Sequence, residues 1–166
     1  MKNLFRRKAQ EESAVTIWAP VTGKLIPIQE VDDPVFAQCM VGDGVALVPE
    51  TEEVVAPVSG TLTQLFPSGH AAGITTPEGI EILIHVGLDT VELKGEGFTR
   101  VVEPGQFVRA GTPLIRLDLE KLKVIARSLA TPVIVSNMPS IEKMEKASPS
   151  FVHAGEDWVL KVWPKR

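Results

Sequence analysis

Two of the three histidines, His70 and His85, flank a segment whose composition is typical of a β-hairpin. A short apolar run adjoins each histidine, and the turn-forming residues 76–79 (TPEG) separate the two runs. If Pro77 and Glu78 form a two-residue loop, the resulting register places His70 opposite His85. Their β-carbons would then lie about 5 Å apart on one face of the sheet, so the ring nitrogens could share a ligand or a transferring group.

The pattern of side chains along the second run supports this register. One face would carry the apolar residues Ile80, Ile82, Ile84 and Val86, and the other would carry Glu81, Leu83 and His85. A shift of one residue would separate the histidines, because successive side chains point to opposite faces. Two histidines that only form structural hydrogen bonds to the backbone would give the same sequence pattern. The pattern alone therefore leaves two interpretations open, a functional histidine pair and a chance placement of two structural histidines. His153 has no such partner, and we assign it no role.

Composition limits the classes of protein to which this chain can belong. The chain has 166 residues, of which 44% are hydrophobic, enough for one well-covered core and too few for two ordinary domains. Its net charge of −4 disfavours a nucleic-acid partner. Cys39 is the only cysteine, which excludes an internal disulfide and favours a reducing cytoplasm. The sequence shows no secretion signal and no membrane-spanning run.

The elements that must position the histidines are predicted to be strands. Short β-branched or alternating runs lie between 13 glycines and 13 prolines, which predicts an all-β sandwich or barrel. Residues 19–25 (APVTGKL) recur 37 residues later as 56–62 (APVSGTL), which predicts duplicated hairpin motifs. We also expect one or two short surface helices, at residues 119–129 behind Asp118 as N-cap and at residues 138–146.

The first thirteen residues differ from the rest in composition. They are polar and charged, so we expect a flexible tail at 1–13 and a single domain at 14–166. Leu4 and Phe5 lie among four basic residues, Lys2, Arg6, Arg7 and Lys8. At most, this tail would make weak contact with an anionic membrane, because one short apolar face binds marginally.

Residues 84–98 (IHVGLDTVELKGEGF) resemble the phosphorylation-site signature of the glucose-family enzyme IIA proteins of the bacterial phosphoenolpyruvate-dependent sugar phosphotransferase system. Further similarity covers residues 35–37, 41–44, 55–61, 69–71 and 131–138. The resemblance implies a β-sandwich in which His85 accepts a phosphoryl group from the phosphocarrier HPr and passes it to the IIB domain of a sugar permease. It also implies that His70 lies against His85 and that Ser68, usually Thr in the family, orients the His70 ring.

The chemistry implied by this resemblance needs no organic cofactor. A neutral imidazole is a good nucleophile near pH 7, and a backbone carbonyl, that of Gly87, could fix its tautomer by accepting Nδ1–H. His70 could donate to the phosphoryl oxygens. We expect an apolar docking floor with acidic groups around it, partly overlapping the core at Val41 or Val86. The floor would comprise Val35, Phe36, Met40, Val41, Phe66, Leu83 and Val86, and the acidic groups Asp33, Glu81, Asp89 and Asp43.

Two other classes of function remain as alternatives. A zinc-dependent peptidase similar to the LytM type would need three protein ligands, but the chain has no His-x-His pair. A regulatory binding module without phosphotransfer would use the same face to contact permeases or metabolic enzymes. A weak Zn²⁺ site at His70 and His85 is also conceivable, with its remaining ligand supplied by a partner.

Overall fold

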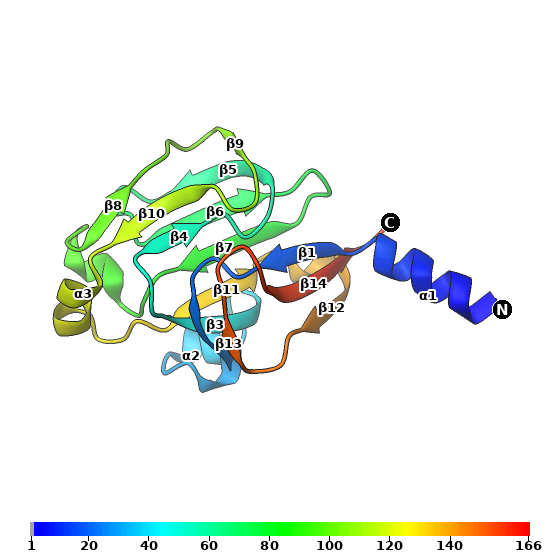
Figure 1. Cartoon of the computed structure of the whole chain (residues 1–166), viewed down its shortest axis with the longest axis horizontal. Coiled ribbons are helices and arrows are strands. Elements are labelled where there is room, and N and C mark those ends of the chain that lie inside the picture. The colour runs from blue at the N-terminus through cyan, green and yellow to red at the C-terminus, as the bar shows by residue number, and fades with distance from the viewer. Residues whose placement is uncertain (1) are drawn as a thin grey trace.

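The fold is an antiparallel β-sandwich, described for residues 2–166 by a computed structural model (Figure 1). One layer is an eight-stranded sheet. From edge to edge its strands are β13 (Phe151–Val152), β2 (Gly23–Pro27), β3 (Asp43–Pro49), β11 (Thr131–Val135), β7 (Glu81–His85), β6 (Ala71–Thr75), β5 (Gly60–Leu65) and β9 (Phe107–Val108). The prediction of an all-β sandwich is confirmed.

Two three-stranded sheets form the other layer. One contains β1 (Val15–Trp18), β14 (Trp158–Pro164) and β12 (Ile141–Lys146), and the other contains β4 (Glu53–Val55), β10 (Pro113–Leu117) and β8 (Phe98–Arg100). Apolar residues from all three sheets form one buried cluster, which includes Ile17, Leu47, Ile82, Leu114 and Leu160. The sandwich is therefore held together by burial of apolar side chains between its layers.

The two copies of the repeated sequence take matching places. Residues 19–25 lead into β2 and residues 56–62 lead into β5, and the order of strands in the large sheet is symmetric about its centre. The two copies also bond reciprocally: the amide of Trp18 donates to the carbonyl of Pro57 (2.8 Å), and that of Val55 donates to the carbonyl of Pro20 (2.8 Å). The duplication predicted from the sequence is thus built into the fold.

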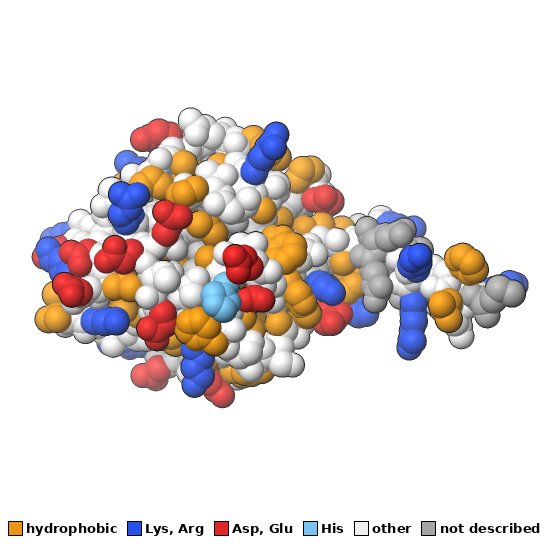
Figure 2. Space-filling view, in the orientation of Figure 1, with side chains coloured by type: hydrophobic (Ala, Val, Ile, Leu, Met, Phe, Trp, Pro, Cys, Tyr) orange, Lys and Arg blue, Asp and Glu red, His pale blue; other side chains and the backbone are white. Residues whose placement is uncertain are grey.

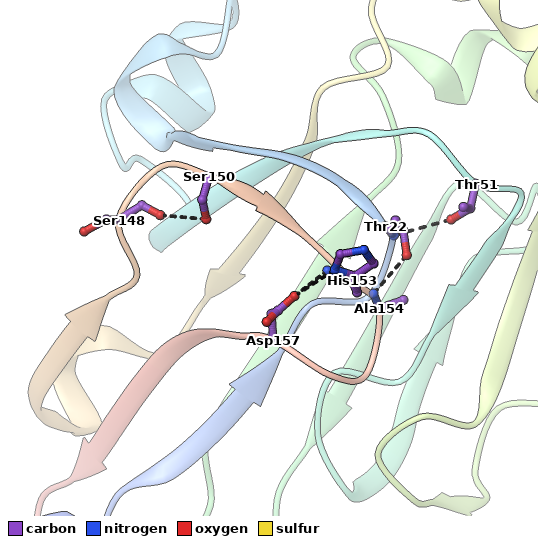
Figure 3. Close-up of polar contacts among 7 residues, drawn as sticks. All are labelled: Thr22, Thr51, Ser148, Ser150, His153, Ala154 and Asp157. Atoms are coloured by element: carbon purple, nitrogen blue, oxygen red, sulfur yellow. Dashed lines mark hydrogen bonds and ion pairs between the residues drawn. The ribbon is translucent and has the colours of Figure 1, made fainter.

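The match extends to the edge strands. Thr22 Oγ1 accepts the amide of Ala154 (3.0 Å), and Ser59 Oγ accepts that of Ala110 (2.9 Å). Figure 3 shows the first of these contacts, beside His153 at the end of β13. Residues 107–111 (FVRAG) and 151–155 (FVHAG) occupy equivalent turns, so His153 stands where the other half has an arginine. Nothing in this equivalence gives His153 a chemical role.

Helices are short except at the N-terminus. The α-helices are α1 (Lys2–Glu12), α2 (Pro34–Ala37) and α3 (Leu119–Ile125), and the 3-10 helices are η1 (Ile28–Glu30), η2 (Thr90–Leu93) and η3 (Met138–Ser140). Helix α1 occupies most of the segment expected to be a flexible tail, and it projects from the sandwich (Figure 1). Met1 of that tail lies outside the described residues. No helix among the described residues has the length and apolar character that crossing a bilayer demands.

One of the two predicted surface helices is confirmed and the other is wrong. Helix α3 begins after Asp118, whose carboxylate accepts the amide of Lys121 (3.2 Å), but it ends at Ile125 because Ala126 is extended. Residues 138–146 form η3 followed by β12, whose pairing with β14 outweighs the helical spacing of its side chains.

Helix α3 offers a test of the core. Leu122 is fully buried, whereas Val124 is 83% exposed on the same helix. We expect Leu122→Ala to lower the free energy of unfolding by about 2–5 kcal/mol, because a cavity remains. The matched variant Val124→Ala should change it by no more than about 0.5 kcal/mol. Urea unfolding measures both, and equal losses would show that α3 does not pack as described.

Candidate functional site

His70 and His85 meet on the outer face of the large sheet. His85 is the last residue of β7, and His70 immediately precedes β6. Their ring centroids are 5.2 Å apart, and the ring planes are inclined at 76°. The expected proximity of the two rings is therefore present.

The register that was predicted to bring them together is wrong by one residue. Ala71, not His70, pairs with His85, and the amide of Val86 donates to the carbonyl of His70 (2.7 Å). The hairpin loop is one residue longer than expected because Thr76 closes it: Thr76 Oγ1 accepts the amide of Ile80 (3.1 Å). His70 lies before the strand, behind Gly69 (φ +75°), so the alternation of strand side chains does not govern its direction.

One hydrogen bond orients each ring. His85 Nδ1 lies 2.7 Å from the carbonyl oxygen of Gly87, and His70 Nδ1 lies 2.5 Å from Ser68 Oγ. A carbonyl can only accept, so His85 carries its proton on Nδ1 and its Nε2 keeps a free lone pair when the ring is neutral. Both partners are the residues that the sequence had assigned to these rings.

The turn that presents the Gly87 carbonyl depends on Gly87 itself and on Thr90, to which the sequence analysis gave no role. Gly87 has φ +79°, and a β-carbon there would lie 2.5 Å from Thr90 Cγ2 and 2.8 Å from the Ser128 carbonyl. The buried Thr90 hydroxyl donates to the carbonyl of Val86 (2.6 Å). Thr90 lies within the signature of residues 84–98, and that was the one available indication of its importance.

Aromatic rings flank the pair. Phe36 packs against His85 and Phe66 against His70, each with a centroid separation of 5.3 Å. Phe36 is only 7% exposed, so it supports His85 from below and offers a partner little surface. Val86 is fully buried, as expected for one of the two residues assigned to the core, whereas Val41 is 40% exposed.

The remaining residues of the expected docking surface differ in exposure and in their contacts, and Glu81 is exposed at the opposite end of β7 from His85. Val35, Met40 and Val41 are exposed, and Leu83 is half-buried. Asp33 Oδ1 caps α2 by accepting the amide of Val35 (3.0 Å). Asp43, in contrast, is bound by Lys146 (2.6 Å) and by the amide of Gly44 (2.8 Å), so its charge is already neutralised.

Burial favours the neutral form of both histidine rings. It lowers the pKa of His70, which is 2% exposed, and the nearby charge of His85 lowers it further. Burial also lowers the pKa of His85, and the Gly87 carbonyl, Asp33 and Asp89 oppose this effect without reversing it. Burial raises the pKa of Cys39, with help from Asp43, so this thiol stays protonated.

His153 lies outside this arrangement. Its Nδ1 is 3.3 Å from Asp157 Oδ2, and the same oxygen accepts the His153 amide (2.7 Å), which fixes the turn between β13 and β14 (Figure 3). Among the side chains that the structure describes, which leave out residues 1 and 9–12, no three from His, Cys, Asp or Glu gather where they could hold a metal ion. The His70–His85 pair alone is two ligands, one fewer than a catalytic zinc site takes from its protein.

The chain belongs to the EIIA 1 family of the phosphoenolpyruvate-dependent sugar phosphotransferase system, whose family model matches residues 15–141. A glucose-specific EIIA component from Oceanobacillus iheyensis is 44% identical over 97% of this chain and 98% of the relative. One from Halalkalibacterium halodurans is 47% identical over 97% and 96%. The solved structure of glucose permease IIA from Mycoplasma capricolum superposes with a TM-score of 0.84, at 39% identity over 89% of this chain and 95% of that one.

Family membership decides between the classes considered from the sequence. The chain is a phosphotransferase component with the sandwich of that family. The zinc peptidase alternative has no support from the comparisons.

The lowered histidine pKa values predict how stability depends on pH. Unfolded histidines bind protons below about pH 6.5. Folded His70 and His85 bind them only at lower pH, so the free energy of unfolding should fall as pH drops below about 6.5 and level off below the folded pKa values. His70→Gln should flatten this fall. Urea unfolding of the wild type and of His70→Gln, measured between about pH 7.5 and about pH 5, tests this prediction because that range spans the ordinary histidine pKa. Parallel curves of unfolding free energy against pH for the two proteins would contradict it.

Proposed function

We propose that His85 accepts a phosphoryl group on Nε2 from phospho-HPr and passes it to the IIB domain of a sugar permease. The observation that carries this proposal is the 2.7 Å contact between His85 Nδ1 and the Gly87 carbonyl, which leaves Nε2 as the nucleophile. The donor's bond to phosphorus breaks as the Nε2–P bond forms, and the Nδ1 proton stays in place. In the transfer to IIB, the Nε2–P bond breaks as phosphorus bonds to the acceptor group of IIB.

His70 stabilises the transferring group in this proposal. The Ser68 hydroxyl, 2.5 Å from His70 Nδ1, can donate or accept. In this proposal it donates to Nδ1, so the neutral ring carries its proton on Nε2 and donates it in a hydrogen bond to a phosphoryl oxygen. Positioned donors are the main contribution that a protein makes to phosphoryl transfer. The ring cannot swing away easily, because Phe66 packs against it and it is almost fully buried.

Partners dock on the surface around the pair. Of the residues expected to form it, Val35, Met40 and Val41 are exposed and apolar, and Asp33 and Asp89 lie close enough to His85 to influence its pKa. Their negative charge, together with that of Glu81 at the start of β7, suits basic patches on HPr and IIB. The names of the relatives support a permease of the glucose class as acceptor. Membership of the EIIA family supports a cytoplasmic location. Regulated permeases or metabolic enzymes would use the same surface. The chemistry requires no cofactor, and Zn²⁺ at the pair would need a further ligand from a partner.

The histidine pair can be tested by a kinetic series with phosphoenolpyruvate, enzyme I and HPr. His85→Ala should abolish acid-labile phosphorylation, measured by intact mass. His70→Ala should slow it by about a hundredfold to a thousandfold, because one donor is lost. His70→Gln, which retains a donor, should recover part of the rate. Phosphorylation of folded His85→Ala at another residue, or an unimpaired His70→Ala, would overturn the assignment.

Helix α1 supports the weak membrane contact considered from the sequence. Leu4 is 77% and Phe5 is 70% exposed, beside Lys2, Arg6, Arg7 and Lys8. Figure 2 shows hydrophobic and basic side chains together on this projecting helix. An apolar pair flanked by cations suits an anionic lipid surface.

Vesicle sedimentation tests this contact. The chain should bind vesicles that contain anionic phosphatidylglycerol weakly, and binding should fall in added salt because charge contributes to it. Replacing Leu4 and Phe5 with Ser should reduce binding, whereas Val124→Ser, an equally exposed residue on α3, should not. Equal binding to neutral vesicles would contradict an electrostatic contribution.

A further inference from the structure

A single guanidinium, that of Arg127, joins two segments that border the His85 ring. Arg127 follows α3, and its Nη1 lies 3.3 Å from Asp89 Oδ2. Its Nη2 donates to the backbone carbonyl of Asp32. Asp32 precedes the acidic residue Asp33, and Asp89 follows the turn whose carbonyl fixes the His85 proton. One side chain therefore connects the two segments that carry negative charge to the site.

The backbone beside Arg127 fixes where this side chain starts. Ser128 and Leu88 form an isolated antiparallel bridge, in which the Leu88 amide donates to the Ser128 carbonyl (3.0 Å). The bridge places residues 127 and 89 side by side. Both side chains of the ion pair are 49% exposed, so a docking partner can reach them.

The ion pair concerns one of the few charged groups that influence His85. The charges that raise the His85 pKa are Asp33, before α2, and Asp89, while the other titratable group facing the ring is His70, before β6. Asp33 uses a carboxylate oxygen to cap α2. Asp89 is at the N-cap position of η2 without a capping hydrogen bond from its side chain, and its carboxylate pairs with Arg127 instead.

We propose that Arg127 is a positioning residue that holds the acidic rim of the histidine site in place and moderates its charge toward cationic partners. This inference rests on the proposed phosphotransfer function. A cationic side chain of a partner has to share Asp89 with Arg127 or displace it. Arg127 therefore restrains the attraction of basic partners and limits the effect of Asp89 on His85.

Substitution of Arg127 tests both effects. In Arg127→Gln the pKa of His85, followed by NMR titration of the protein alone, should rise, because Asp89 is no longer neutralised. The second-order rate constant for transfer from phospho-HPr should increase about two- to tenfold at low salt, and the increase should shrink at high salt. Arg127→Lys keeps the charge and should stay near the wild type in both measurements.

Two controls separate this role from general charge and from stability. Lys121→Gln removes the same charge from another exposed ion pair on α3, with Glu96 (2.8 Å), and should move neither quantity. In an Asp89→Asn background, Arg127→Gln should no longer raise the His85 pKa.

An unchanged His85 pKa in Arg127→Gln would overturn the proposal. So would slower transfer that Arg127→Lys does not restore, because that outcome indicates a purely structural residue. The pKa measurement needs no partner, so failure of HPr to phosphorylate the wild type would count against the proposed function and leave the test of Arg127 intact.

Discussion

The hydrogen bond from His85 Nδ1 to the Gly87 carbonyl is the interaction on which the rest of the site depends. It decides which ring nitrogen is free, and it requires a carbonyl that turns back toward a side chain two residues earlier. Gly87 allows this with φ +79°, in a space that a β-carbon would fill. Thr90 and the Ser128 bridge then hold the turn. The proton on His85 Nδ1 is therefore held in place by Gly87, by the buried hydroxyl of Thr90 and by the distant chain segment at Ser128.

The site arises where the two similar halves of the sandwich differ. In one half, His70 precedes β6 and His85 ends β7. In the other half, the matching strands β3 and β11 are covered by η1 and α2. That covering segment buries Ile28, Val31 and Phe36 against Ala46 and Ile134. The same segment places Phe36 on the His85 ring and Asp33 near it. Duplication supplies a rigid frame, and the asymmetric cover adds the environment of the reactive ring.

Local patterns were sufficient to predict the class of fold and the duplication, and the family resemblance supplied Ser68 as the partner of the His70 ring. The alternation of Ile80, Ile82 and Ile84 placed β7, and a short signature located His85. What failed depended on contacts distant in sequence or on a single side chain. Thr76 lengthened the hairpin loop by closing it with its hydroxyl. Residues 141–146 became a strand because β14 was available to pair with them. Arg127 lies 38 residues from Asp89 (127 − 89), so no local pattern connects them.

Two electrostatic requirements oppose each other at His85. A nucleophilic ring has to be neutral near pH 7, and burial achieves this by lowering the pKa. Docking of basic partners favours negative charge nearby, yet Asp33 and Asp89 raise the same pKa. The structure reconciles the two requirements through geometry: one carboxylate caps a helix, and the other is paired with a guanidinium that remains half-exposed. Negative charge therefore stays accessible at the rim while the balance at the ring still favours the neutral form, since desolvation remains the largest of the contributions to its pKa.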